Sequence, residues 1–260
     1  MRLSHARSLV TALALLGFGV LSNSPATATA DDVPTVDQIM EKYIEATGGK
    51  AVYEKIKNTQ TKGTLEFPAA GLKGTLSVYG AEPAKMYSET ELEGVGVIKN
   101  GTDGETAWEV NPLTGARIMT GAERDGFLRA AALHSELKWK DLYEKSEVKG
   151  TEDVDGKTCY KVVFTPKEGA GSPETKYFDK QSGLLTKVTA TVNSPMGDIA
   201  TESYPTNYQE VDGLKLPFKT TQKVLTQEIV ITIDTVKFNV EIPKDRFDLP
   251  AEIKTLKDKK

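Results

Sequence analysis

The sequence predicts a mainly β fold with added helices, of the α+β class, in which the strands form an antiparallel sheet. Most of the chain alternates apolar and polar residues with a period of two, as strands with one apolar and one wet face do. Turns rich in Asn, Asp and Gly separate these runs, and we count about eleven strands at the spacing of meandering all-β folds. Two segments, one N-terminal and one mid-chain, follow a helical pattern instead.

The first thirty residues have the layout of a secretory signal peptide. Two arginines give a positive start, the span 9–21 is almost wholly apolar, and Ala28 and Ala30 are the small residues that a signal peptidase reads. The apolar span is too short to cross a bilayer, which argues against an uncleaved anchor. We therefore expect cleavage after Ala30 and a single mature domain over residues 31–260.

The composition of the mature chain narrows its partners and its location. Two of the 33 basic residues lie in the leader, which has no acidic residue, so 31 basic and 37 acidic residues remain and the formal net charge is −6. This balance argues against nucleic acid and against a generic anionic membrane surface. We expect no transmembrane segment in the mature chain. The expected location is the periplasm or another exported space, without a lipid anchor, because no cysteine follows the leader.

The mature domain opens with a helix. Its apolar residues recur with the 3.6-residue period at Val36, Ile39, Met40, Tyr43 and Ile44. Thr35 or Asp37 is placed to cap the helix, and the Gly48-Gly49 pair is placed to end it. A short second helix is expected from Lys50 to Ile56.

Strand-like runs then follow, joined by tight turns. The segments Asn111–Gly115 and Asp179–Gly183 share one layout, with Asn or Asp first and Gly last, which is typical of four- or five-residue hairpins. The stretches "DVDGKT" and "EVDGLK" are two more turns of the Asp-Gly kind. The closing "KTLKDKK" is expected to be a solvated, frayed tail.

One segment in the middle of the chain interrupts the strand pattern. From Ala122 to about Lys138, Ala, Leu, Arg, Glu and Lys dominate, and these are helix formers. Phe127, Ala131 and His134 are spaced to share one face of that helix, and Leu133 lies on a neighbouring ridge. The sequence therefore predicts a mid-chain helix that is apolar over a broad arc.

The usual catalytic and metal-binding patterns are missing from the sequence. His134 is the only histidine of the mature chain and Cys159 the only cysteine, too few for a zinc site, and no G-x-S-x-G motif occurs. The stretch "EDVDGK" begins like a calcium loop, but Thr158 stands where that loop needs Gly. No nucleotide-binding motif is present. We therefore expect no catalytic residue, no metal and no cofactor; a paired-carboxylate hydrolase is the less favoured alternative.

The order of these elements resembles a known family. The stretches that carry the resemblance are "YIEATGGKAVYEKIKNTQTKGTLEF", "DGETAWEVNPLTG", "YFDKQSGLLTKV" and "VDGLKLPFKTT". With the leader, the helix ending in Gly-Gly and the mid-chain helix, they resemble the LolA-like superfamily of periplasmic outer-membrane lipoprotein-sorting proteins, which includes the LolA/LolB-type half-barrels. The resemblance spans about residues 35–250.

The resemblance implies an incomplete, strongly curved β-barrel whose open side is covered by helices over an apolar cavity. Its members carry lipoprotein acyl chains, bind other lipids or sense envelope stress. The inward apolar residues of the strands are then the candidates to line the cavity: Leu65, Phe67, Leu76, Val78, Met86, Trp108, Val110, Ile118, Val162, Phe164, Leu184, Val188, Phe218, Ile229 and Ile231. The candidates for a lid over it are Phe127, Leu128, Ala131, Leu133 and His134.

The resemblance thus favours a carrier or sensor that holds the acyl chains of a lipid or lipoprotein. A second hypothesis uses the same fold with a filled core, since inward side chains can simply pack one another, as in any small barrel. That protein would be an envelope module with a stable protein partner and no lipid. The volume enclosed between the sheet and the helices separates these two hypotheses.

Overall fold

A computed structural model of the chain describes residues 33–194 and 197–259. The signal peptide expected over residues 1–30 lies outside the described residues.

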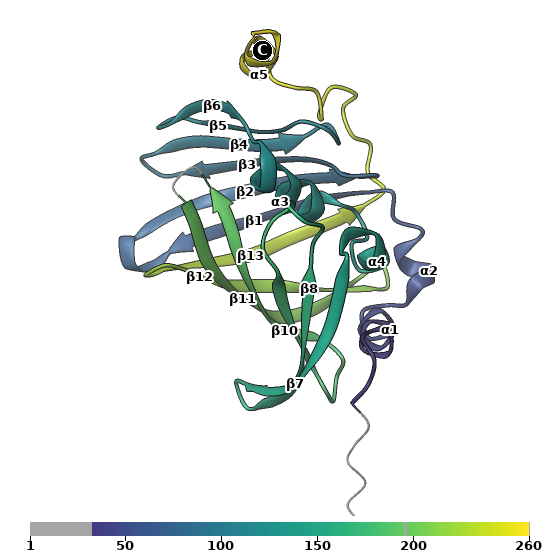
Figure 1. The fold of residues 1–260 in the computed structure, drawn as a ribbon. Coiled ribbons are helices and arrows are strands. Elements are labelled where there is room, and N and C mark those ends of the chain that lie inside the picture. The colour runs from purple at the N-terminus through teal and green to yellow at the C-terminus, as the bar shows by residue number, and fades with distance from the viewer. Residues whose placement is uncertain (1–32, 195–196, 260) are drawn as a thin grey trace, which may run out of the picture. The chain divides into compact units, whose positions relative to one another are not determined.

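Within the described residues, thirteen strands form one antiparallel sheet that does not close into a barrel (Figure 1). The spatial order is β6-β5-β4-β3-β2-β1-β13-β12-β11-β10-β9-β8-β7, so β6 and β7 are the two edges. The strands are β1 (Asn58–Phe67), β2 (Leu72–Ala81), β3 (Lys85–Leu92), β4 (Gly96–Thr102), β5 (Ala107–Asn111), β6 (Gly115–Ile118), β7 (Lys145–Val154), β8 (Lys157–Thr165), β9 (Glu174–Asp179), β10 (Leu185–Ser194), β11 (Gly197–Val211), β12 (Leu214–Val224) and β13 (Gln227–Phe238).

The sheet has two arms that meet at the β1–β13 pair. One arm, β1 to β6, is built in chain order outward from the centre, and the other, β7 to β13, is built back toward it. Five α-helices accompany the described sheet: α1 (Val36–Ala46), α2 (Lys50–Tyr53), α3 (Gly121–Ala131), α4 (Trp139–Leu142) and α5 (Ala251–Asp258). The α+β class and the open antiparallel sheet predicted from the sequence are confirmed.

The structure has two strands more than the approximate count from the sequence. Strand β3 shows why alternation undercounts. Its Ser88 and Thr90 pair with Val78 and Leu76 of β2, so these polar residues lie on the same face as apolar ones. Ser88 is only 8% exposed. A strand that turns small polar side chains toward a covered face does not show the expected pattern.

Helix α1 begins and ends as the sequence indicates. The Thr35 hydroxyl accepts a hydrogen bond from the Gln38 backbone at 3.3 Å, and the Gln38 side chain accepts one from the Thr35 backbone at 2.8 Å, which forms a capping box. After the helix, Gly48 has φ +131°, and a Cβ there would lie 2.3 Å from the Gly213 carbonyl oxygen. A glycine therefore lets the end of α1 approach the β11–β12 turn closely.

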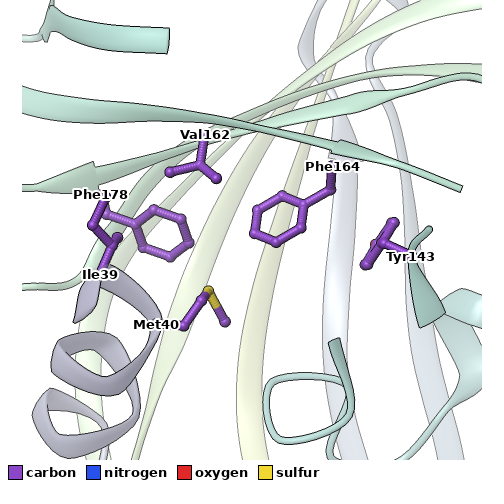
Figure 2. Packing of buried hydrophobic residues seen from close by; sticks show 6 residues of the cluster. All are labelled: Ile39, Met40, Tyr143, Val162, Phe164 and Phe178. Atoms are coloured by element: carbon purple, nitrogen blue, oxygen red, sulfur yellow. The ribbon is translucent and has the colours of Figure 1, made fainter. Parts of the chain in front are cut away.

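The main hydrophobic core lies between α1 and the β8–β9 part of the sheet (Figure 2). Ile39 and Met40 of α1 point toward Val162 and Phe164 of β8 and toward Phe178 of β9. All five side chains are between 0% and 3% exposed. Part of the sheet that was expected to line a cavity is therefore packed solid by a helix.

Helix α3 is shorter than the predicted helix over 122–138. It ends at Ala131, Ala132 is extended, and His134 takes a left-handed conformation with φ +60°. The His134 ring nitrogen Nε2 lies 2.6 Å from the carbonyl oxygen of Ile56, so this nitrogen donates and the carbonyl accepts. A contact 78 residues distant in sequence thus overrides the local helical preference, and His134 is not on the helix.

The C-terminal segment is also ordered where a frayed tail was expected. Residues 251–258 form α5, which packs on β6, and its Ile253 is fully buried. The Lys257 ammonium donates to the Thr106 hydroxyl at 3.2 Å. Before the helix, the Arg246 guanidinium lies 4.8 Å from the Tyr79 ring and 4.9 Å from the Tyr87 ring. The prediction of a frayed tail was wrong because buried apolar and cation–π contacts hold this segment.

Candidate ligand-binding site beneath helix α3

Helix α3 lies over the sheet between its two arms and contacts β5 in one arm and β10 in the other (Figure 1). Two cavities lie between this helix, the segment after it and the sheet. We call the face of the sheet that borders these cavities the inner face, and the opposite face the outer face.

The larger cavity, about 480 Å³, lies between α3 and the strands β5, β6 and β10. Its apolar wall comes from Met119, Phe127, Ala190 and Val192. Three of the six residues that the helix contributes are small: Ala122, Gly126 and Ala130 follow one another at intervals of four. Residues four apart share a helix face, so this face of α3 leaves room above the sheet.

The smaller cavity, about 320 Å³, lies on the other side of the C-terminal end of α3. Ala130 lines both cavities, so the end of the helix separates them. The smaller cavity is lined by Tyr53, Ile56, Thr59, Thr61, Val78, Gly80, Met86, Ala130, Ala131, Ala132, Leu133, His134, Ser135, Glu136, Leu214, Leu216, Val236 and Phe238. Both volumes fall in the range of small-molecule sites, roughly 300–1,000 Å³.

A network of ion pairs ties the start of α3 to the β5–β6 edge. The Arg117 guanidinium of β6 lies 2.8 Å from Glu123 of α3 and 3.3 Å from Glu109 of β5. Hydrogen bonds to Glu123 and Glu109 raise the pKa of Arg117 above its usual value, although partial burial opposes this. The helix is therefore anchored by charge at its N-terminal end.

A second charged cluster lies on the inner face near the other arm. The Lys176 ammonium is 2.9 Å from the Glu174 carboxylate, which also accepts a hydrogen bond from the Tyr143 hydroxyl. Burial raises the pKa of Glu174, but Lys176, Tyr143 and Arg129 outweigh it, so this pKa lies below its usual value. Burial likewise opposes the charge of Lys176, yet Glu174 holds the pKa of Lys176 above its usual value.

His134 and Cys159, the histidine and the cysteine of the described residues, are committed to structural contacts. His134 is buried, bonded to the Ile56 carbonyl and packed edge-on against the Tyr53 ring. Cys159 is buried on the outer face, where burial raises the pKa of its thiol. In the part of the chain that the structure describes, no group of three His, Cys, Asp or Glu residues could hold a metal ion.

The expected lid residues reach three different places. Phe127 lines the larger cavity, while Ala131, Leu133 and His134 line the smaller one. Leu128 lies instead in a separate groove of about 400 Å³ beside α3 and α4, with Pro83, Ala84 and Leu142. Most of this set therefore borders the space under α3.

The expected cavity residues divide among several environments. Val78 and Met86 line the smaller cavity. Val162 and Phe164 belong to the core under α1, and Leu184 lies in the turn before β10. The remaining residues of the set are buried or half-buried and line neither cavity under α3: Leu65, Phe67, Leu76, Val188, Phe218, Ile229 and Ile231.

Three of the expected cavity residues lie on the outer face. Trp108 pairs with Ile118 across β5 and β6, and Val110 shares their side of the sheet. Glu109 and Arg117, which alternate with them, line the larger cavity. The expectation for Trp108, Val110 and Ile118 is corrected accordingly. The C-terminal segment packs on this outer face: α5 contacts β6, and Arg246 stacks on Tyr87, whose ring lies 6.2 Å from that of Trp108.

Sequence reasoning missed other lining residues. Val192, Leu214 and Leu216 carried the alternation signal of strands but were not chosen as cavity candidates. Met119 follows a strand and Glu136 follows the helix, so neither has a periodic signal. Only the way the chain turns after α3 brings Glu136 to the smaller cavity.

Comparisons with known proteins bear on the fold. No protein-family model and no curated protein matches the sequence. The structure of a DUF1329 family protein from Desulfovibrio piger matches 85% of this chain and 100% of its own, at 14% identity and a TM-score of 0.59. A LolA superfamily protein from Nitrosomonas europaea matches 84% of this chain and 99% of its own, at 14% identity and a TM-score of 0.55.

A third structure, of a domain assigned to outer-membrane lipoprotein sorting in Vibrio parahaemolyticus, matches 80% of this chain and 97% of its own. Its sequence is 13% identical and its TM-score is 0.51. The chain thus belongs to the class of open antiparallel sheets covered by helices. More narrowly, its fold is LolA-like, as the sequence resemblance predicted.

Among the described residues, none forms a helix that is both long and apolar enough to span a membrane.

Proposed function

We propose that this protein is an exported, periplasmic carrier or sensor that binds the acyl chain of a lipid or lipoprotein beneath α3, without catalysis. The observation that carries this proposal is the hollow beside α3, walled by Met119, Phe127 and Val192 on its apolar side. The LolA-like fold and the sequence of the leader support it. The DUF1329, LolA superfamily and lipoprotein-sorting structures share this fold, and the last of them is named for outer-membrane lipoprotein sorting.

The energetics suit an acyl chain. Burying one methylene contributes roughly 0.8 kcal/mol, so a sixteen-carbon chain gains on the order of 12 kcal/mol before ordering costs. Moving α3 offsets part of that gain. The ion pairs of Arg117 hold the start of α3, and the hydrogen bond from His134 to Ile56 holds the segment after its end. Affinity then depends on how readily this lid opens.

Uptake of a fluorescent fatty acid tests the proposal. We expect the wild-type protein, stripped of co-purified lipid, to bind the probe at a ratio near one per chain. Phe127→Asp should lower the affinity by roughly tenfold or more, because it places a charge in the apolar wall. Leu113→Asp is the matched control, since Leu113 is 77% exposed in the β5–β6 turn.

Two outcomes would contradict the proposal. One is a stripped wild-type protein that takes up no probe, which favours the alternative of an envelope interaction module with a protein partner. The other is a Phe127→Asp variant that keeps both its unfolding midpoint and its probe affinity, which rules out the lid. Mass spectrometry of gently extracted protein provides the independent check, because a carrier should retain lipid.

A further inference from the structure

Glu136 stands apart from the other charged residues of the inner face. It follows α3 in the segment that leads to α4, and it lines the smaller cavity. Among the described residues, no other Asp, Glu, Lys or Arg lines that cavity. Most of the remaining wall is apolar, as with Ile56, Val78 and Phe238. The half-buried Glu136 carboxylate thus places one negative charge in this wall, and a cationic group of a ligand would complement it.

Glu136 has no such partner within the described residues 33–194 and 197–259. The structure records neither a hydrogen bond nor an ion pair for its carboxylate there. The other carboxylates of the inner face differ in this respect: Glu174 is paired with Lys176, and Glu109 and Glu123 are paired with Arg117.

Glu136 lines the smaller cavity together with Tyr53, and its charge acts on three tyrosines. Burial raises the pKa of Tyr43, Tyr53 and Tyr208, and the charge of Glu136 raises all three further. The Tyr53 hydroxyl already bonds to Thr47 at 2.8 Å, and the Tyr208 hydroxyl donates to the Leu185 carbonyl at 2.9 Å. The Tyr53 and Tyr208 hydroxyls therefore form their hydrogen bonds with other groups and donate none to Glu136.

The remaining charged and titratable neighbours do not neutralise it either. Glu136 acts on Lys176 at longer range, but the Lys176 ammonium is bound by Glu174 at 2.9 Å. His134 directs its Nε2 to the Ile56 carbonyl. The wall of the smaller cavity thus combines apolar side chains with one acidic side chain and the hydroxyls of Thr59, Thr61 and Ser135.

We infer that the smaller cavity binds an amphipathic ligand whose head group is an amine. The Glu136 carboxylate would accept a hydrogen bond from the ammonium group. This inference rests on the proposed function and names the ligand class within it. The tail would lie against the apolar wall, where Met86 and Val236 offer contact area. A cationic head group gains the most binding free energy here, because Glu136 is the one acidic residue that lines this cavity among the described residues.

Three ligands with one chain length test the head group: dodecylamine, dodecanol and dodecanoate, each titrated calorimetrically below its micelle concentration. We expect the wild-type protein to bind dodecylamine roughly 10- to 100-fold more tightly than dodecanoate, the range of a charge-assisted hydrogen bond. Glu136→Gln should abolish this preference while leaving dodecanol affinity within about twofold. Glu144→Gln, on the exposed residue before β7, is the control for charge and should keep the preference.

Each remaining outcome decides between the two proposals. If Glu136→Gln keeps the preference for amine, or the wild-type protein favours dodecanoate, the head-group inference is overturned while lipid binding stands. If none of the three ligands binds, the proposed function fails and the inference with it. Glu136→Lys is the second variant, and reversal of the preference toward dodecanoate would support the assignment independently.

Discussion

The inner face of the sheet has a packed half and a hollow half. Under α1, Ile39 and Met40 fill the space above Val162, Phe164 and Phe178 (Figure 2). Under α3, two cavities remain. The strands of both halves follow the same alternation, so the difference lies in the helices. Helix α1 turns large side chains toward the sheet, whereas α3 turns a row of small residues toward it, with Phe127 beside that row.

The largest expected effect lies in the packed half. Phe164→Ala should lower the free energy of unfolding by ~3–5 kcal/mol, because Phe164 is fully buried and packs against Tyr143 and Trp139. Urea denaturation followed by circular dichroism measures the loss. A loss below about 1 kcal/mol would mean that this half is not tightly packed either, and the contrast between the halves would disappear.

The charged cluster between the halves should give the next largest effect. Lys176→Met leaves the Glu174 carboxylate without its ion-pair partner and should cost roughly 3 kcal/mol at neutral pH. The Glu174 pKa is depressed in the folded protein, so the stability it contributes is present above its unfolded pKa and is lost as the pH falls through its folded pKa.

The difference in stability between wild type and Lys176→Met should therefore shrink in acid. Urea denaturation at neutral pH and at pH values near and below the usual glutamate pKa measures it. Glu174→Gln with Lys176→Met closes a double-mutant cycle, and we expect the double variant to be more stable than Lys176→Met alone. A difference that grows in acid would contradict the assigned ion pair.

The smallest expected change in stability has the sharpest consequence for binding. Gly126→Leu should fill the larger cavity from α3, and a Cβ at Gly126 meets nothing closer than the Arg129 guanidinium at 3.8 Å. Replacing a helical glycine should stabilise the protein by about 0.5–1 kcal/mol, while uptake of the fluorescent fatty acid should fall. Unchanged uptake in a folded variant would place the ligand elsewhere than the larger cavity.

Local signals allowed much of the fold to be predicted. The capping box at Thr35, the end of α1 at Gly48 and Gly49 and the hairpin between Asn111 and Gly115 all depend on neighbouring residues. Alternation reveals which side chains share a face, but not which face is the inner one. Trp108 was misplaced for that reason, since the C-terminal segment covers the outer face of its strand.

The parts that sequence could not predict depend on contacts between distant segments. The end of α3 is set by the hydrogen bond from His134 to Ile56, and the residues next to His134 in sequence do not predict this bond. The same turn of the chain carries Glu136 to the smaller cavity. Helix α5 likewise forms because of distant contacts: Ile253 is buried, and Lys257 donates a hydrogen bond to Thr106.

The meeting of β1 and β13 at the centre of the sheet has a consequence for how the chain folds. All the other strand pairs of the described sheet join strands that are consecutive in sequence. The β1–β13 pair instead joins the first strand to the last, with Thr59 opposite Phe238. Contacts of such long sequence separation form slowly, because they close the largest loop. We expect each arm to assemble first as a local meander, and the pairing between β1 and β13 to form last.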